Sequence, residues 1–144
     1  MKPDKFFVGV KGLIIKDNKL LLLKKNAADP KIDQEFWDLP GGRIAIEEGL
    51  KPCLRRELQE ELPGISQVEI GRLVWAYPVP RPIFNDNYLI LLYYQVEADV
   101  SQSGLSDEHT VKKWVGVKQF ADLKLPVNRN LERVLAELTG QNHH

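Results

Sequence analysis

Residues 41–61 read GGRIAIEEGLKPCLRRELQEE, and the second half of this stretch has the pattern of an amphipathic helix. Leu54, Leu58 and Leu62 recur every four residues and form an apolar row. This row predicts a helix over residues 50–62, and the proline-glycine pair that follows Leu62 ends it. The helix should bury its leucine side and leave its other faces for polar residues.

Three acidic residues with i, i+3 and i+4 spacing share one face of this helix: Glu57, Glu60 and Glu61. Like charges at this spacing repel by about 0.2–0.5 kcal/mol per pair, and Arg56 offsets only part of the repulsion. Carboxylates are hard oxygen ligands of the kind that Mg²⁺ prefers. The spacing therefore indicates either a metal site or, as the alternative, a solvated charged face.

The composition is that of one ordinary globular domain. The chain has 144 residues, of which 43% are hydrophobic and 28% are charged. Twenty Lys and Arg balance twenty Asp and Glu, so no global field attracts a nucleic acid polymer or an anionic membrane. We expect a single domain over residues 1–140, with residues 141–144 as a tail or a purification-tag remnant.

Cysteine usage and hydropathy bear on localisation. Cys53 is the sole cysteine, so an intramolecular disulfide is excluded, which fits a reducing cytosol. The N-terminal residues contain no apolar stretch long enough for a signal peptide or a membrane span. These features predict a cytoplasmic protein that does not bind membranes.

Apolar runs predict a β-sheet. The expected strands cover residues 6–15, 20–23, 68–76, 88–96 and 114–117. Asp17-Asn18 should join the first two strands as a hairpin, and the run NYLILLYYQV suggests a strand buried on both faces. Residues 26–35 should form a loop.

Two further signals complete the expected fold. Gly41-Gly42 should break the chain, and a second amphipathic helix should close it on the pattern of Leu131, Val134, Leu135 and Leu138. Strands with a helix on either side predict an α/β protein with a sheet covered on both faces.

The spacing around the helix resembles the Nudix box, the signature of hydrolases that cleave nucleoside diphosphates linked to another moiety. Gly42 is followed by five residues and Glu48, and seven more lead to Arg56-Glu57-Leu58-Gln59-Glu60-Glu61. After the box, one extra residue precedes the expected glycine, Gly64, and Glu47 stands where many members have glycine. The resemblance implies the Nudix-type α/β/α sandwich, with a mixed sheet between helices.

The resemblance also implies roles for individual residues. A divalent metal, Mg²⁺ or alternatively Mn²⁺, would be held by Glu57, Glu60, Glu61 and the backbone carbonyl of Gly41. Arg56 would orient Glu57. Glu48 would support the loop rather than bind metal.

The chain looks most like the MutT branch of the family. The string LLLKKNAAD, which contains Lys25, precedes FWDLPGG as a similar string does in MutT. Glu108 lies six residues before Trp114, as a catalytic glutamate does there. The string LPVN, which ends at Asn128, is similar to the Pro-rich turn whose Asn reads the purine in MutT. Asn87 stands where MutT has an arginine that contacts the base. This resemblance implies Glu108 as a catalytic residue, with Glu57 as the competing general base, and Lys25, Asn87 and Asn128 as substrate-binding residues.

Simpler interpretations remain open for several of these residues. Asn128 could cap the last helix, because Asn is a favoured N-cap residue. Glu108 could be one charge in a polar loop, and Lys25 a solvated charge at a strand end. Pro80 lies 16 residues after Gly64, close to the spacing in relatives that cleave ADP-ribose, although a loop is its default interpretation.

The function implied is metal-dependent hydrolysis of a phosphorus-containing anhydride. We expect a MutT-like pyrophosphohydrolase that converts a nucleoside triphosphate to a nucleoside monophosphate and pyrophosphate. One alternative is an ADP-ribose or nucleotide-sugar pyrophosphatase, and another is a nucleotide-binding Nudix module without turnover. The expected partner is a small nucleotide rather than a nucleic acid polymer or a membrane, with a homodimer left open.

Overall fold

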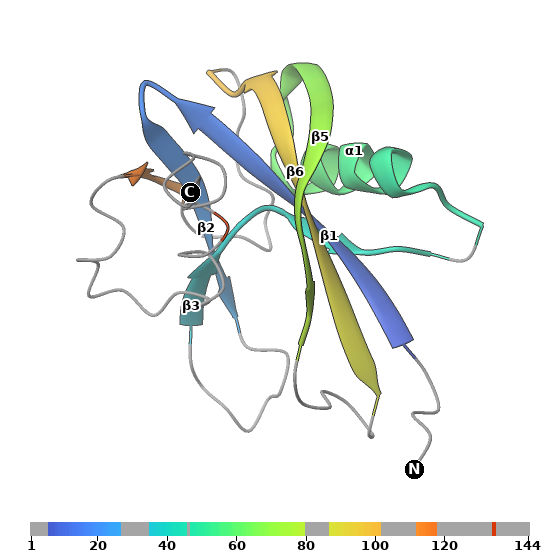
Figure 1. Ribbon diagram of the computed structural model, residues 1–144. Helices are drawn as coiled ribbons and strands as arrows, with labels where there is room; N and C mark the ends of the chain where they lie inside the picture. Colours follow the sequence, from blue (N-terminus) through green and yellow to red (C-terminus); the bar gives the residue numbers. More distant parts are fainter. Residues whose placement is uncertain are drawn as a thin grey trace, which may run out of the picture.

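Seven strands form one mixed sheet in the computed structural model, which describes residues 6–26, 35–45, 47–79, 87–101, 112–117 and 134. The elements in chain order are β1 (Phe6–Lys16), β2 (Lys19–Asn26), β3 (Glu35–Asp38), β4 (Gly41–Arg43), α1 (Leu50–Glu61), β5 (Ser66–Pro78), β6 (Tyr88–Asp99) and β7 (Lys112–Gly116) (Figure 1). The sheet order is β3-β2-β1-β6-β5, with β4 paired to β1 and β7 paired to β2. The expected α/β class and mixed sheet are confirmed.

Strand β1 organises the sheet. It pairs in parallel with β6 along most of its length, and on its other edge it pairs first with β4 and then with β2. The turn into β2 has positive φ at both Asp17 (53°) and Asn18 (62°), which matches the right-handed twist of a tight hairpin. The predicted hairpin is therefore confirmed.

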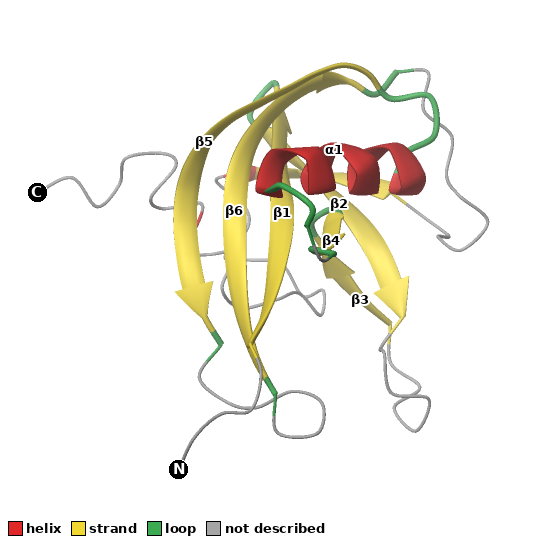
Figure 2. Cartoon of the chain, turned by 90° about the vertical axis from the view of Figure 1, so that its right-hand side faces the viewer, coloured by secondary structure: helices red, strands yellow, loops and turns green. Residues whose placement is uncertain are grey.

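Each face of the sheet carries its own apolar cluster. On the face covered by α1, the helix packs Leu54, Leu58 and Leu62 against strand residues such as Val10 and Ile14 (Figure 2). The opposite face gathers a second cluster around Tyr93. Fully burying one such side chain contributes about 1.5–3 kcal/mol, so the cluster on the α1 face holds the helix on the sheet.

Strand β6 contributes residues to both clusters. Leu91 and Tyr93 belong to one cluster, whereas Tyr94 and Val96 belong to the other. The expectation of a strand buried on both faces is confirmed, because these residues are buried in clusters on opposite faces of the sheet.

The expected break at Gly41-Gly42 is wrong. Both glycines lie in β4, which pairs with Gly9–Lys11 of β1, and the preceding residues 35–38 form β3. The chain instead leaves one strand and enters the next at Leu39-Pro40, where the N–H of Gly12 donates to the Pro40 carbonyl at 2.9 Å. Pairing with β1 outweighs the low strand propensity of glycine.

The expected C-terminal helix lies outside the described residues except for Val134, which is helical and fully buried in the cluster around Tyr93. Within the described part of the chain, no helix combines the length and hydropathy needed to cross a membrane.

Candidate active site

The first contact in the site joins β4 to the end of α1. Strand β4 places Gly41 opposite Lys11 of β1, alongside the helix. The Gly41 N–H donates to Oε1 of Glu61 at 2.8 Å, and Glu61 is only 5% exposed. A buried carboxylate is thus tied directly to the backbone of the glycine whose carbonyl is the candidate metal ligand.

Glycine is required at residue 41, and the absence of a side chain at Gly42 leaves room for Glu57. Gly41 has φ +149°, and a Cβ there would collide with the Val10 carbonyl oxygen. A Cβ on Gly42 would collide with the carboxyl group of Glu57. The two glycines therefore allow β1 and two glutamates of α1 to approach the same short strand.

Arg56 is the centre of an ion-pair network on the solvent side of the site. Its Nε and Nη2 donate to the two oxygens of Glu48 at 2.7 and 2.9 Å. Its Nη1 donates to Oε1 of Glu57 at 3.1 Å and to Oε1 of Glu60 at 3.2 Å. One guanidinium thus contacts three carboxylates and orients Glu57 and Glu60.

Glu48 anchors the loop before α1. Its Oε1 also accepts a hydrogen bond from the Ala45 N–H at 3.2 Å. Hydrogen bonds from Arg56, and secondly from Ala45, lower the pKa of Glu48 to about 2. The carboxylate is therefore fully ionised near neutral pH and is already engaged by the loop and by Arg56.

The electrostatics of Glu57 differ from those of Glu48. Burial raises the pKa of the Glu57 carboxyl above its usual value, Arg56 opposes the shift, and the charges of Glu60 and Glu61 add to it. These causes describe a partly desolvated site with excess negative charge. A divalent cation would relieve that excess, and oxygen donors suit Mg²⁺ and Mn²⁺.

The three helix glutamates, which were expected to share one face of α1, differ in their burial. At about 100° per residue, Glu61 is about 60° from the leucine row, Glu57 about 100° and Glu60 about 160°. Their exposure follows that order: Glu61 is 5% exposed, and the side chains of Glu57 and Glu60 are 17% and 59% exposed. Among the described residues, no three His, Cys, Asp or Glu side chains are already gathered as a ligand group.

A buried ion pair that the sequence analysis missed lies beside the site. Lys11 Nζ contacts Oδ2 of Asp38 at 3.0 Å, with side chains 12% and 7% exposed, and Asp38 Oδ1 accepts the Leu39 N–H at 2.7 Å. The signal in the sequence was a lysine inside the apolar strand VGVKGLII and an aspartate directly before Leu-Pro-Gly-Gly. This pair connects β1 to the turn that leads into Gly41.

The residues proposed from the MutT resemblance are described only in part. Lys25 lies in β2 opposite Phe36, and Asn87 is half-buried and directly precedes β6. Glu108, Asn128 and Pro80 lie outside the described residues.

The comparisons with known proteins agree with this geometry. A family model described as the NUDIX domain matches residues 5–138. The 8-oxo-dGTP diphosphatase of Buchnera aphidicola subsp. Schizaphis graminum is 42% identical over 51 residues, which cover 35% of this chain and 38% of that protein. The RNA pyrophosphohydrolase of Orientia tsutsugamushi (strain Boryong) is 22% identical over 142 residues, which cover 89% of this chain and 86% of that protein.

A solved structure is similar along the whole chain. The MutT protein from Methanosarcina mazei Go1 has a TM-score of 0.79 with 20% sequence identity and covers 100% of both chains. At this identity, the similarity shows a shared fold.

Proposed function

Because the chain belongs to the NUDIX family and is a pyrophosphohydrolase, we propose that it hydrolyses a nucleoside triphosphate to a nucleoside monophosphate and pyrophosphate. The observation that carries the proposal is the approach of two carboxylates of α1 to the backbone of β4, with Glu61 at Gly41 and Glu57 at Gly42. The Buchnera relative named 8-oxo-dGTP diphosphatase supports a triphosphate substrate.

The proposed metal ligands are Glu57, Glu60, Glu61 and the carbonyl oxygen of Gly41. All four supply hard oxygen atoms, and the burial and mutual repulsion that raise the pKa of Glu57 favour a cation there. When bound, Mg²⁺ would neutralise these carboxylates and polarise the phosphate oxygens of the substrate.

Residues of the chain would prepare the site for an attacking water. Arg56 holds Glu57 and Glu60 in place, and Glu48 fixes Arg56 from the other side. Hydrolysis forms a bond from the water oxygen to phosphorus and breaks the bond to the pyrophosphate oxygen, while a carboxylate accepts the water proton. Glu57 is one candidate for that carboxylate, because Arg56 orients it, and Glu108 is the other.

Glu108→Gln separates the two candidate bases, whereas Glu57→Gln would lower kcat in either case because Glu57 is also a proposed metal ligand. If Glu108 is the base, its variant should lose kcat by about 10²–10⁴-fold with substrate binding nearly unchanged. If kcat of that variant stays within a factor of about two of the wild type under saturating metal and substrate, Glu108 is not the base and Glu57 becomes the better candidate.

A substrate panel tests the function. Purified protein with Mg²⁺ should release pyrophosphate from at least one nucleoside triphosphate, and excess chelator should abolish release. ADP-ribose, a nucleotide sugar and a 5′-triphosphorylated oligonucleotide complete the panel. The oligonucleotide is included because the relative that matches most of the chain is named RNA pyrophosphohydrolase.

The outcomes of this panel are distinct. Turnover of ADP-ribose or of the oligonucleotide alone would replace the proposed substrate while leaving the enzyme class intact. Unchanged hydrolysis in chelator would contradict the metal role. Glu69→Gln, which alters an exposed glutamate on β5, is the matched control for Glu57→Gln.

A further inference from the structure

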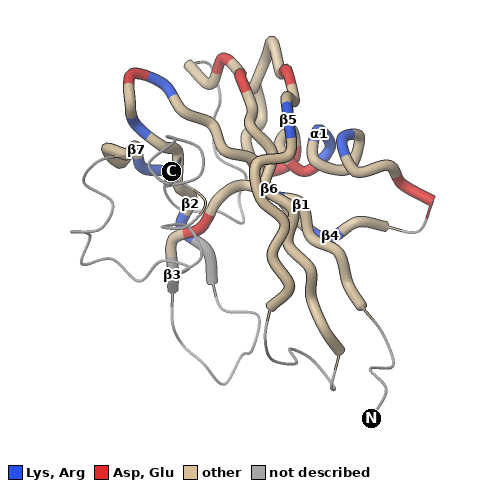
Figure 3. The backbone as a smooth tube through the Cα atoms, viewed as in Figure 1, with Lys and Arg blue, Asp and Glu red and all other residues tan. Residues whose placement is uncertain are grey.

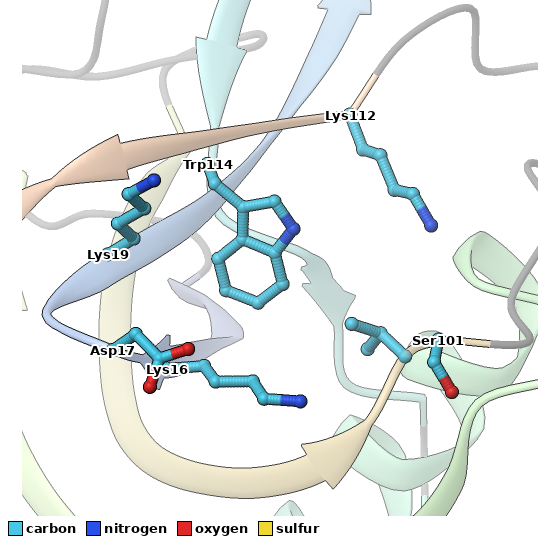
Figure 4. A pocket seen from close by; sticks show the side chains of 7 residues that line it. Lys16, Asp17, Lys19, Ser101, Lys112 and Trp114 are labelled. Carbon is cyan, nitrogen blue, oxygen red and sulfur yellow. The ribbon is translucent and has the colours of Figure 1, made fainter.

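An open hollow of about 370 Å³ lies at one end of the sheet, away from the carboxylate site. Three separate segments line it: the β1–β2 hairpin with Lys16, Asp17 and Lys19, the end of β6 with Ser101, and β7 with Lys112 and Trp114 (Figure 4). On β1, Lys16 is five residues beyond Lys11, which pairs with Gly41. At about 3.3 Å per residue the two places are about 17 Å apart along the strand.

The hollow concentrates positive charge in a chain that has no net charge. Three lysines and one aspartate line it, and basic residues colour both the hairpin and β7 (Figure 3). In the close view, the side chains of Lys16 and Lys112 extend toward Ser101 past the Trp114 ring, whereas Lys19 points its amine away from Ser101 (Figure 4).

Asp99, the carboxylate beside Ser101, already accepts hydrogen bonds. Oδ1 of Asp99 accepts hydrogen bonds from the Ser101 N–H at 2.9 Å and from its hydroxyl at 2.6 Å. These bonds, and to a smaller extent the charge of Lys16, lower the pKa of Asp99. Asp99 keeps its negative charge, so among the described residues three lysines stand against the carboxylates of Asp17 and Asp99, and the hollow has a net positive charge.

Trp114 provides an aromatic surface in the hollow. The indole is half-buried and packs against the apolar cluster on the α1 face, so its ring is held in place by the core. The ring lies in the middle of the hollow, with the lysines around it (Figure 4). A fixed aromatic plane stacks on a nucleobase, and ammonium groups bind phosphate.

We propose that this hollow is a second nucleotide-binding site, in which the base stacks on Trp114 and Lys16 and Lys112 bind the phosphate. The volume lies within the range of small-ligand pockets. The same chemistry would take a free nucleoside monophosphate or one nucleotide of an oligonucleotide. The site is separate from the carboxylates of α1, so ligand binding there does not require the hydrolytic reaction.

The test follows the indole N–H resonance of Trp114 by NMR in protein labelled with ¹⁵N, kept in chelator so that hydrolysis does not interfere. The chain has three tryptophans, and Trp114→Phe assigns the signal. Adding AMP, or separately a 5′-phosphorylated dinucleotide, should shift the Trp114 signal saturably. Inorganic phosphate alone and adenosine alone should bind at least about 10-fold more weakly, because each uses half of the contacts.

A double variant of the lining lysines tests the phosphate contacts, and a variant of a neighbouring lysine is the control. Lys16→Ala/Lys112→Ala should weaken AMP binding at least about 10-fold, the scale expected for losing charged phosphate contacts. Lys113→Ala is matched, since Lys113 neighbours Lys112 but lies over the Trp37 ring, 6.0 Å from its centroid. Lys113→Ala should bind AMP as the wild type does.

The two ligands distinguish the source of the nucleotide. A shift with AMP supports a free-nucleotide site, and a shift with the dinucleotide only supports a site for an oligonucleotide. A Trp114 signal that does not move with either ligand, or that moves equally in the double lysine variant, overturns the proposal. Pyrophosphate release by the double variant should stay within about twofold of the wild type, which keeps this result independent of the proposed hydrolysis.

Discussion

Gly41 and Glu61, which are twenty residues apart in the chain, are joined by a 2.8 Å hydrogen bond from the glycine N–H to Oε1 of the carboxylate. The bond connects the first residue of β4 to the last residue of α1. Because Glu61 is 5% exposed, the bond is shielded from water and fixes the end of the helix against the strand. The carboxylate thus has both a structural partner and a proposed metal-binding role.

Glu61 variants should separate these two roles. Glu61→Gln keeps an oxygen that can accept the Gly41 N–H but removes the charge, so turnover should fall by at least about 100-fold. The metal-free fold should be as stable as the wild type or slightly more stable, because like-charge repulsion is relieved. Glu61→Ala also removes the acceptor and should lower the free energy of unfolding by about 1–3 kcal/mol.

Urea denaturation without metal and a pyrophosphate-release assay measure both effects. Glu60→Ala, at an exposed position, should leave stability almost unchanged. Near-normal turnover of well-folded Glu61→Gln would show that α1 carries only a charged face.

Gly42→Ala should damage activity by displacing Glu57. A Cβ at residue 42 would collide with the Glu57 carboxyl group, so the glutamate must leave its position next to Arg56. We expect kcat to fall by at least about tenfold, whereas stability should change little, because the Glu57 carboxyl is the end of a flexible side chain that can move aside. Gly71→Ala is the matched control in a strand, because its Cβ would lie 3.4 Å from the nearest atom, Gln95 O. Equal activity of the two variants would contradict the proposed position of Glu57.

Removing one partner of the Lys11–Asp38 pair should destabilise the fold more than replacing both partners with uncharged residues. Lys11→Met leaves the Asp38 carboxylate buried without its ammonium partner, a change that typically destabilises by about 3–5 kcal/mol. Lys11→Met/Asp38→Asn should recover much of that loss, because it removes both charges and keeps an oxygen that can accept the Leu39 N–H. Thermal or urea unfolding of the two single variants and the double variant measures the coupling. Additive effects of the single variants would show that the pair contributes no interaction energy.

Glu48→Gln should change the stability of the fold in a pH-dependent way. The folded-state pKa of Glu48 is about 2, below its usual value of 4.5, so the ionised carboxylate stabilises the fold fully above pH 4.5. That contribution is lost as the pH falls from 4.5 through about 2. The difference in free energy of unfolding between wild type and variant should therefore shrink across this window.

Urea denaturation at a series of pH values tests this expectation, with Glu47→Gln at the exposed neighbouring position as the control. A wild-type advantage that is the same at about pH 6 and about pH 2.5 would exclude the Arg56–Glu48 pair as its source.

The sequence by itself determined the local elements and the chemical type of the site. Helix α1 followed from the four-residue repeat of leucine, because burial of one helix face depends on spacing within the segment. The β1–β2 hairpin followed from Asp17-Asn18, whose side chains tolerate the positive φ of the turn. The spacing of Gly42, Glu48 and the helix glutamates indicated the family, which the match over residues 5–138 confirmed.

Only the tertiary structure decided how those residues meet. The strand pairing of Gly41-Gly42 depends on Gly9–Lys11, and the burial of Glu61 depends on the position of β4 beside the helix. The Lys11–Asp38 pair and the hollow around Trp114 join segments far apart in the chain. Contacts of this kind arise where strands pack side by side. A residue's neighbours in space then come from distant parts of the sequence, so the residues next to it in the chain do not determine its environment.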